Sequence, residues 1–391
     1  MFRRARLSRI TRTPIVCSIA STRGLRILAS PKHHPHTRIA VLYQAVEPPV
    51  VNGLRKPKKP GGYRDSGADI CYVLRQHGHD VITEAEQPSP LQDDGWCFPD
   101  TERGIKAAID RGATHLWANT TLFAAHPLQA SEALDRYAPR LRVVGQPPLL
   151  VDAFDDKNFV NALLRRTARF TLPDSRILDC ADTALVLGMR YPVVGKPIRG
   201  RGSHGVKLCR NEGTLRAHLE SLLKESPLVM VEEYLPGEEG TVTIMPPSSD
   251  HPGYWSLPLV VRFNHEDGIA PYNGVVAVTS NSRILSDEEL QADPTYADIC
   301  KQCEHVAEML RVTAPIRIDV RRVTKEKGSK FAMFDINMKP NQTGPGRPGR
   351  EDQASLTAMA ATKLGWDYGA LLMHVLGSAP TLKELRSISL N

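Results

Sequence analysis

Two stretches in the C-terminal half of the chain place polar residues at every second position of an apolar run. They are Arg317-Ile-Asp319, within residues 315–323, and Asp335-Ile-Asn337, within residues 330–337. Because side chains alternate between the two faces of a β-strand, the polar residues of each stretch share one face. In neighbouring strands, Asp319, Asp335 and Asn337 would meet as oxygen ligands for Mg²⁺. The alternative is ordinary polar alternation on a solvent-facing strand, although a buried carboxylate pair without a cation would be costly.

A glycine-rich loop follows a predicted strand at residues 191–197. The loop reads Arg-Gly-Arg-Gly-Ser-His-Gly over residues 199–205. Its glycines allow backbone N–H groups to converge on a phosphate, and its arginines add positive charge. The loop matches neither the Walker pattern nor the dinucleotide fingerprint, since it has no GK[ST] ending and no GxGxxG spacing. The alternative is the flexible tip of a hairpin.

A predicted strand at residues 229–235 ends in acidic residues and a Pro-Gly turn. The sequence from residue 231 reads Val-Glu-Glu-Tyr-Leu-Pro-Gly-Glu-Glu. The backbone of such a segment can bind the edge of an adenine ring, and a following carboxylate can accept hydrogen bonds from ribose hydroxyl groups. The alternative is an ordinary hinge with solvated acids.

The remaining pattern indicates an α/β (α+β) fold built from several units. Strands at 38–43, 114–119 and 141–144 alternate with helices at 65–77 and 101–111, which predicts a small open parallel sheet. The central unit adds a strand at 206–209 and a helix at 212–223. The last unit is strand-rich, with further strands at 240–245, 255–263 and 275–279 and covering helices at 296–310, 354–364 and 368–376. The expected divisions are a basic tail (1–37), an N-terminal domain (38–150) and two α+β units (151–235 and 236–391).

The positive net charge is concentrated at the N-terminus. The chain carries +7 overall, but residues 1–46 contain eight Arg, one Lys and no Asp or Glu, so the remainder carries −2. A basic surface for nucleic acid is therefore not expected, and no apolar run reaches the length of a membrane helix. The acid-free, Arg- and Ser/Thr-rich tail is typical of a transit peptide to the mitochondrial matrix. The alternative is a disordered basic extension on a cytoplasmic protein.

The order of these segments resembles the ATP-grasp superfamily, and within it the D-alanine–D-alanine ligases. The resemblance rests on seven pieces in the right order and covers about residues 38–377. Besides the segments above, it includes Asp156-Lys157 and the lysine at position 196. It implies an N-terminal open-sheet domain followed by two subdomains that sandwich ATP.

The resemblance also implies roles for individual residues. The residues expected to contact ATP are Lys157, Lys196, Ser203, Glu232, Glu233, Tyr234, Leu235 and Glu239. Asp319, Asp335 and Asn337 are expected to bind two Mg²⁺ ions, for which Mn²⁺ can substitute. Arg317 is expected to neutralise the oxyanion of a tetrahedral intermediate, with Lys196 as a second catalytic residue.

Three departures from the family pattern concern the substrates. D-alanine ligases carry a GGxSxE pattern after the first strand, whose glutamate binds the amine of the first substrate. Here Glu47 could stand in for that glutamate, and Asn341 replaces a glycine at the substrate edge. The family offers no counterpart for the Gly-Pro-Gly-Arg347-Pro-Gly-Arg350 segment. Either arginine could bind a substrate carboxylate, the alternative being a rigid Pro/Gly linker.

The sequence thus predicts an ATP- and Mg²⁺-dependent carboxylate–amine ligase. Its reaction would form a dipeptide or related amide through an acyl-phosphate and release ADP and phosphate. The alternatives are another ATP-grasp ligase, such as a carboxylase or acid–thiol ligase, or a non-catalytic nucleotide-binding regulator. The expected partners are small amino-acid substrates, without nucleic acid or membrane, and a second copy of the chain in a homodimer.

Overall fold

The computed structural model describes residues 37–51, 54–55, 58–186, 188–200, 203–269 and 278–389. The described residues all fall within one compact unit. The basic tail, apart from its last residue, lies outside the described residues, as do positions 201 and 202 of the glycine-rich loop. The domain boundaries expected at residues 150 and 235 fall inside the compact unit and stay predictions.

The small parallel sheet expected near the N-terminus is confirmed. Its strands follow the order β4-β1-β6-β7, with β5 also paired to β1, and every pair is parallel. Residues 39–42 of β1 are fully buried, as in a parallel sheet with covered faces. The strands are β1 (Arg38–Tyr43), β4 (Asp80–Val81), β5 (Phe98–Pro99), β6 (His115–Asn119) and β7 (Arg142–Val144). The helices are α1 (Arg64–Gln76), α2 (Glu102–Asp110), α3 (Pro127–Ala130) and α4 (Pro148–Phe154), and β2 (Val50–Val51) pairs with β3 (Leu54–Arg55).

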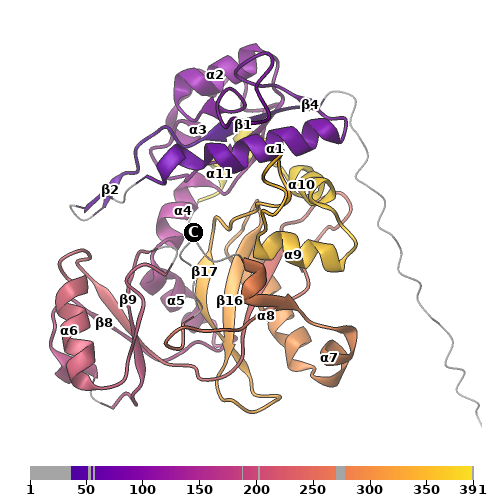
Figure 1. The fold of residues 1–391 in the computed structure, drawn as a ribbon. Coiled ribbons are helices and arrows are strands. Elements are labelled where there is room, and N and C mark those ends of the chain that lie inside the picture. Colours follow the sequence, from indigo (N-terminus) through magenta and orange to yellow (C-terminus); the bar gives the residue numbers. More distant parts are fainter. Residues whose placement is uncertain are drawn as a thin grey trace, which may run out of the picture. The chain divides into compact units, whose positions relative to one another are not determined.

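A four-stranded antiparallel sheet comes next, after helix α5 (Lys157–Arg166). Its order is β10-β9-β11-β8, and α6 packs against β9 and β10 (Figure 1). The elements are β8 (Ser175–Leu178), β9 (Val193–Pro197), β10 (Lys207–Cys209), α6 (Glu212–Leu222) and β11 (Val229–Glu233). Asn211 begins α6 with a capping box shared with Thr214, so the chain turns sharply from β10 into the helix.

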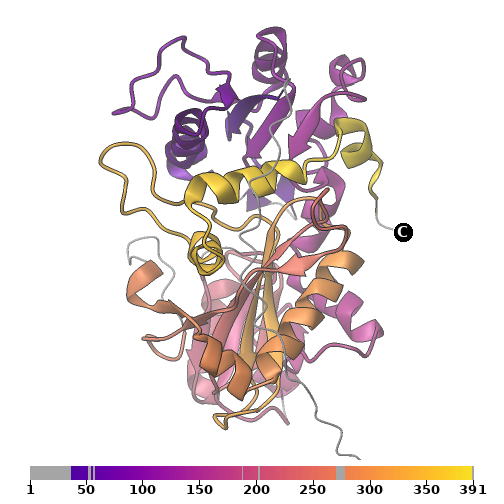
Figure 2. The ribbon, with the colours of Figure 1, turned by 90° about the vertical axis from the view of Figure 1, so that its right-hand side faces the viewer.

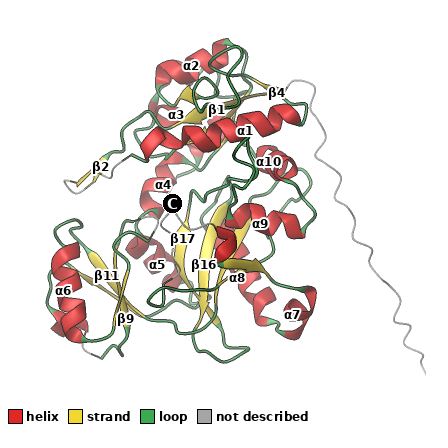
Figure 3. Ribbon diagram, in the orientation of Figure 1, coloured by secondary structure: helices red, strands yellow, loops and turns green. Residues whose placement is uncertain are grey.

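A larger antiparallel sheet follows, and its central strands are β12 and β16. The order is β15-β14-β12-β16-β17, with β13 paired to β12. Figure 3 shows these strands beside the helices of the same part of the chain. The strands are β12 (Glu239–Met245), β13 (Trp255–Ser256), β14 (Val260–Arg262), β15 (Ser282–Ile284), β16 (Ile316–Arg322) and β17 (Phe331–Asn337). The helices are α7 (Asp287–Ala292), α8 (Thr295–Met309) and α9 (Leu356–Lys363).

The last two helices return to the N-terminal sheet (Figure 2). Helix α10 (Tyr368–Gly377) packs on α1 as well as on α9, whereas the sequence pattern predicted that it covers the C-terminal strands. The helix is apolar on nearly all sides, so periodicity could not indicate its neighbours. Helix α11 (Leu382–Ser387) places Leu382 and Leu385 in the core of the N-terminal sheet.

Two strand predictions need correction. The run at 255–263 forms two short strands, because Pro258 has no N–H group to continue the ladder. In the stretch 275–279, Val278 and Thr279 belong to a 3₁₀ turn, and residues 275–277 lie outside the described part of the chain. Among the helices that the structure describes, none has both the length and the apolar character needed to cross a bilayer.

Candidate functional site

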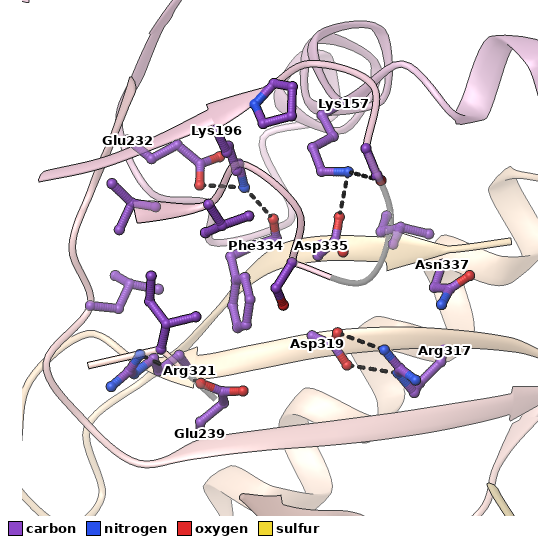
Figure 4. A pocket seen from close by; sticks show the side chains of 18 of the residues that line it. Lys157, Lys196, Glu232, Glu239, Arg317, Asp319, Arg321, Phe334, Asp335 and Asn337 are labelled. Atoms are coloured by element: carbon purple, nitrogen blue, oxygen red, sulfur yellow. Dashed lines mark hydrogen bonds and ion pairs between the residues drawn. The ribbon is translucent and has the colours of Figure 1, made fainter. Parts of the chain in front are cut away.

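One cavity lies between the two antiparallel sheets and the start of α5. It encloses about 1350 Å³, its open mouth included. The residues predicted to contact ATP, the metal or the oxyanion all line it, and Figure 4 labels most of them. They are Lys157, Lys196, Ser203, Glu232, Glu233, Tyr234, Leu235, Glu239, Arg317, Asp319, Asp335 and Asn337.

The two acidic strands are direct neighbours. In the β16–β17 pairing, Asp319 lies opposite Asp335, and Arg317 lies opposite Asn337. The pairing then shifts by one residue, which leaves Phe334 without a partner in a β-bulge. The carbonyl oxygen of Phe334 accepts a hydrogen bond from Lys196 Nζ at 2.9 Å. At this bulge, β17 is thus linked by a hydrogen bond to Lys196 on β9 of the neighbouring sheet.

Lys196 forms a buried ion pair inside the cavity. Its Nζ lies 2.6 Å from Glu232 Oε2, and both side chains are almost fully buried. The two residues lie on adjacent strands, since β9 pairs with β11. Removing either partner would leave a charge in a site with little water, which is costly. The pair therefore holds an ammonium group at a fixed place between two sheets.

Lys157 and Asp335 form a second ion pair across the cavity. Lys157 Nζ lies 3.1 Å from Asp335 Oδ1 and donates to the carbonyl of Gly200 at 3.2 Å. Burial alone would raise the pKa of Asp335, but Lys157, Lys196 and Arg317 outweigh it and lower that pKa. Burial likewise opposes the charge on Lys157, yet the nearby carboxylates raise its pKa. Both groups are therefore charged near neutral pH.

Arg317 is oriented by the carboxylate beside it. Its Nε and Nη2 donate to the two oxygens of Asp319 at 3.0 and 3.1 Å. Thr241 on β12 also donates to Asp319, at 2.5 Å. This two-point contact fixes the plane of a guanidinium group that is itself buried. Arg317 is thus a preorganised cation at the edge of the cavity.

The glycine-rich loop is the turn of a hairpin that also lines the cavity. It connects β9 to β10, which pair antiparallel. Ser203 adopts φ = 58° and Gly205 adopts φ = 70°, so the chain turns back through the left-handed region. Gly200, Ser203 and His204 face the cavity. The loop is therefore a hairpin tip that lines the cavity, and its contact with phosphate stays a prediction.

The acidic segment after β11 contains contacts that sequence reasoning missed. Glu239 Oε2 lies 2.8 Å from His265 Nε2 and 3.5 Å from Arg321 Nη1. The Arg321 guanidinium also lies over the ring of Tyr234, 4.8 Å from its centroid. Arg321 continues the alternation of Arg317 and Asp319, so period two could have indicated it. His265 carries no such signal, because it lies in a loop.

A second cavity adjoins the first at Asn337, Met338 and Val151. Its walls are the N-terminal sheet on one side and residues 337–343 on the other. Asn341, predicted at the substrate edge, lines this cavity. The substrate role of Asn341 stays a prediction, and its position agrees with that role.

The expectations for Glu47, Arg347 and Arg350 are corrected. None of them lines either cavity. Glu47 pairs with Lys58 at 2.7 Å on the surface, and this contact lowers its pKa. Arg347 is buried and Arg350 half-buried, and both bind the carboxylate of Asp69 on α1. Their guanidinium groups are engaged inside the protein, and the structure gives them no contact with a substrate site.

The acidic strands fit a magnesium site in their donor chemistry. Asp319 and Asp335 supply carboxylate oxygens and Asn337 an amide oxygen, the hard ligands that Mg²⁺ prefers. The described residues contain no group of three or more His, Cys, Asp or Glu side chains arranged for a metal. A cation here would therefore depend on phosphate oxygens and water for its remaining ligands, as Mg²⁺ commonly does.

Comparison with known proteins places this geometry in a family. Residues 172–377 match the family model described as the D-ala D-ala ligase C-terminus. A D-alanine–D-alanine ligase of Aquifex aeolicus is 27% identical over 222 residues, which cover 56% of this chain and 68% of that relative.

Solved structures agree in fold. The D-alanine–D-alanine ligase of Bacillus anthracis complexed with ATP aligns with a TM-score of 0.58 at 19% identity, over 90% of this chain and 98% of that one. The D-alanyl-alanine synthetase A of Vibrio cholerae gives 0.58 at 12% identity, over 90% and 99%. Because the family model matches more than half of the sequence, the chain belongs to the D-alanine–D-alanine ligase family.

Proposed function

We propose that this chain is an ATP-dependent ligase that joins a carboxylic acid to an amine through an acyl-phosphate. The observation that supports the proposal most directly is the pairing of Asp319 with Asp335 beside the buried ammonium groups of Lys157 and Lys196. Two carboxylates and two ammonium groups in one cavity suit a nucleotide triphosphate with its cation. The matching family model and relative are named as D-alanine–D-alanine ligases, which supports a reaction that forms a dipeptide or related amide.

The residues of the cavity have different roles in the proposed reaction. A donor carboxylate attacks the γ-phosphorus of ATP, the bond to the bridging oxygen breaks, and ADP leaves. Lys157 and Lys196 bind the phosphate oxygens as charge shifts toward ADP. The amine of the acceptor then attacks the acyl carbon, and Arg317 stabilises the oxyanion before phosphate departs. Positioning and charge neutralisation account for most of such catalysis.

Asp319, Asp335 and Asn337 are the residues that would hold Mg²⁺ in this proposal. When bound, the cation neutralises phosphate charge during the transfer. Lys157 pairs with Asp335 and lowers its pKa, and Arg317 pairs with Asp319. Glu233 to Leu235 and Glu239 would contact adenine and ribose.

The test is phosphate release from ATP and Mg²⁺ across a panel of D- and L-amino acids, alone and in pairs. Release that depends on an added acid and an added amine supports a ligase. Release that requires a thiol or a biotinyl acceptor indicates a different ATP-grasp reaction. ATP binding without stimulated release under any condition indicates a non-catalytic nucleotide-binding regulator and contradicts the proposal.

Two further proposals concern the context of the enzyme. The acid-free, Arg-rich segment 1–37 supports import into the mitochondrial matrix, which a fluorescent fusion of that segment would test. A homodimer is the expected assembly, and light scattering of the purified chain measures it.

A further inference from the structure

Arg321 on β16 lines the cavity of the proposed ATP site at the end away from the metal ligands. Arg317, Asp319 and Arg321 all line this cavity, as expected of alternate residues on one face of a strand. Four residues of a strand span roughly 13 Å, so Arg321 is well separated from Arg317. Figure 4 shows Arg321 beside Glu239, on the side of the cavity away from Arg317 and Asn337. With the phosphates beside the metal ligands, the nucleoside of ATP lies toward Arg321.

The guanidinium group of Arg321 connects two segments at this end of the cavity. Its Nε donates to the carbonyl of Gly237 at 3.1 Å and its Nη2 to the hydroxyl of Tyr234 at 3.0 Å, both in the hinge between β11 and β12. Its Nη1 donates to the carbonyl of Gly268 at 2.7 Å, in the loop after β14. A planar fork of N–H donors that meets three acceptors has one orientation. Arg321 therefore fixes the hinge and the loop relative to each other.

The carboxylate of Glu239 is held from two sides by Arg321 and His265. His265 Nε2 lies 2.8 Å and Arg321 Nη1 3.5 Å from the same oxygen, Oε2. The Glu239 side chain is buried, so its charge needs such partners. An ionised carboxylate has two oxygens and about four lone-pair sites, so these contacts leave it capacity to accept from the hydroxyl groups of a ligand.

We propose that Arg321 and His265 are positioning residues for the nucleoside of ATP, a role that rests on the proposed function. They orient the Glu239 carboxylate toward the ribose hydroxyls, and Arg321 also holds Tyr234 in the hinge. A nucleotide that lacks the hydroxyl leaves a buried, charged acceptor short of a partner, which weakens its binding. The site therefore selects ATP over nucleotides without one ribose hydroxyl, and this selectivity depends on Arg321.

Nucleotide binding tests this role without any ligase reaction. Calorimetric titration of the full chain, with Mg²⁺ present, measures the Kd values of ATP, 2′-deoxyATP and 3′-deoxyATP. The wild type should bind at least one deoxynucleotide roughly 10- to 100-fold more weakly than ATP, as expected for loss of a hydrogen bond to a charged group. Arg321→Met should weaken ATP binding and reduce this ratio to about threefold or less, because the carboxylate is no longer oriented.

Arg322→Met is the matched control. Arg322 is the next residue of β16, is similarly buried and pairs with Asp293 at 2.7 Å, but it is not among the described residues that line the cavity. The control should lower the free energy of unfolding and keep the wild-type ratio of affinities. An equal loss of that ratio in both variants would mean that any disturbance of β16 loosens the site, and would overturn the positioning role.

Two further results would also contradict the role of Arg321. They are an unchanged ratio in Arg321→Met and a wild type that binds all three nucleotides alike. Where Arg321→Met does not fold, His265→Ala removes the other partner of Glu239 and should lower the same ratio about threefold or more. An unchanged ratio in that variant overturns the proposal as well.

Failure of the proposed function gives a different result. A wild type that binds none of the three nucleotides contradicts an ATP-dependent reaction itself. ATP binding without phosphate release in the presence of acid and amine contradicts the ligase reaction, whereas the comparison of nucleotide affinities still tests Arg321.

Discussion

Arg347 Nε donates a hydrogen bond to Asp69 Oδ1 at 2.9 Å, although 278 residues separate the two in the chain. Arg350 binds the other oxygen of the same carboxylate at 2.7 Å. Asp69 lies on α1, and the arginines follow the segment 337–343 that lines the second cavity. Asp69 thus connects the loop that follows residues 337–343 to helix α1 of the N-terminal part.

Substitution of Asp69 should destabilise the protein strongly. Asp69→Asn removes the charge that balances two arginines, one of them fully buried, so the free energy of unfolding should fall by roughly 3–5 kcal/mol. Urea unfolding measures the loss. Asp352→Asn, at an exposed position of the same loop, is the control and should cost little. Equal effects of the two substitutions would show that the network does not stabilise the fold.

Arg317→Ala should separate catalysis from nucleotide binding. Loss of a preorganised cation at the oxyanion should lower kcat roughly 10²- to 10³-fold. Coupled ADP release measures kcat, and calorimetric titration measures ATP affinity, which should remain nearly unchanged. Arg283→Ala removes an exposed pair with Glu289 and serves as the control. A similar loss of affinity and kcat would mean that Arg317 mainly binds the nucleotide.

The buried pair of Lys196 and Glu232 gives a prediction in two steps. Lys196→Met leaves the Glu232 carboxylate buried without its cation and should reduce the free energy of unfolding by roughly 3 kcal/mol. Adding Glu232→Gln should recover part of that stability, because no unpaired charge remains. Neither variant should bind ATP as the wild type does. Thermal unfolding and ATP titration of all three proteins check this, and a double variant no more stable than Lys196→Met would refute the pairing argument.

Removal of one proposed magnesium ligand should change the metal requirement. Asp335→Asn withdraws a charged oxygen, so the Mg²⁺ concentration for half-maximal ADP release should rise by about tenfold or more. Chelation with EDTA should abolish activity of the wild type. Asp298→Asn, exposed on α8, should respond to Mg²⁺ as the wild type does. An unaltered Mg²⁺ titration of Asp335→Asn would exclude Asp335 as a ligand.

Asp100 should make stability depend on pH in the acid range. Burial alone would raise its pKa, but hydrogen bonds from His126, Thr120 and the backbone N–H of Val46 lower it. A folded-state pKa below the unfolded value of about 3.9 gives stabilisation that is complete above that value and is lost as pH falls through the folded pKa.

The Asp100→Asn variant measures this contribution. Its difference from the wild type in free energy of unfolding should be constant, at roughly 1–3 kcal/mol, above about pH 5 and should shrink below about pH 4. Urea unfolding at a series of pH values provides the data. A difference that persists unchanged to pH 3 would contradict a lowered pKa for Asp100.

Much of the fold, and most residues of the cavity between the two antiparallel sheets, could be predicted from the sequence because local rules governed them. Period-two alternation placed Asp319 and Asp335 on strands that pair directly. Alternating strands and helices indicated the parallel sheet. Glycines marked the turn between β9 and β10. Each of these signals lies within a few residues of the structure that it predicts.

The contacts of Glu47, Arg347 and Arg350 were decided by tertiary structure alone. Nothing near Arg347 in the chain indicates Asp69, and nothing near Glu47 indicates that Asp100 fixes the preceding loop through the N–H groups of Ala45 and Val46. A charged side chain takes its role from partners that the fold brings from distant positions, and burial then decides whether it binds a ligand or another residue. The sequence by itself therefore determined which residues line the cavity between the two antiparallel sheets, and only the packed structure determined which charged side chains bind one another inside the protein.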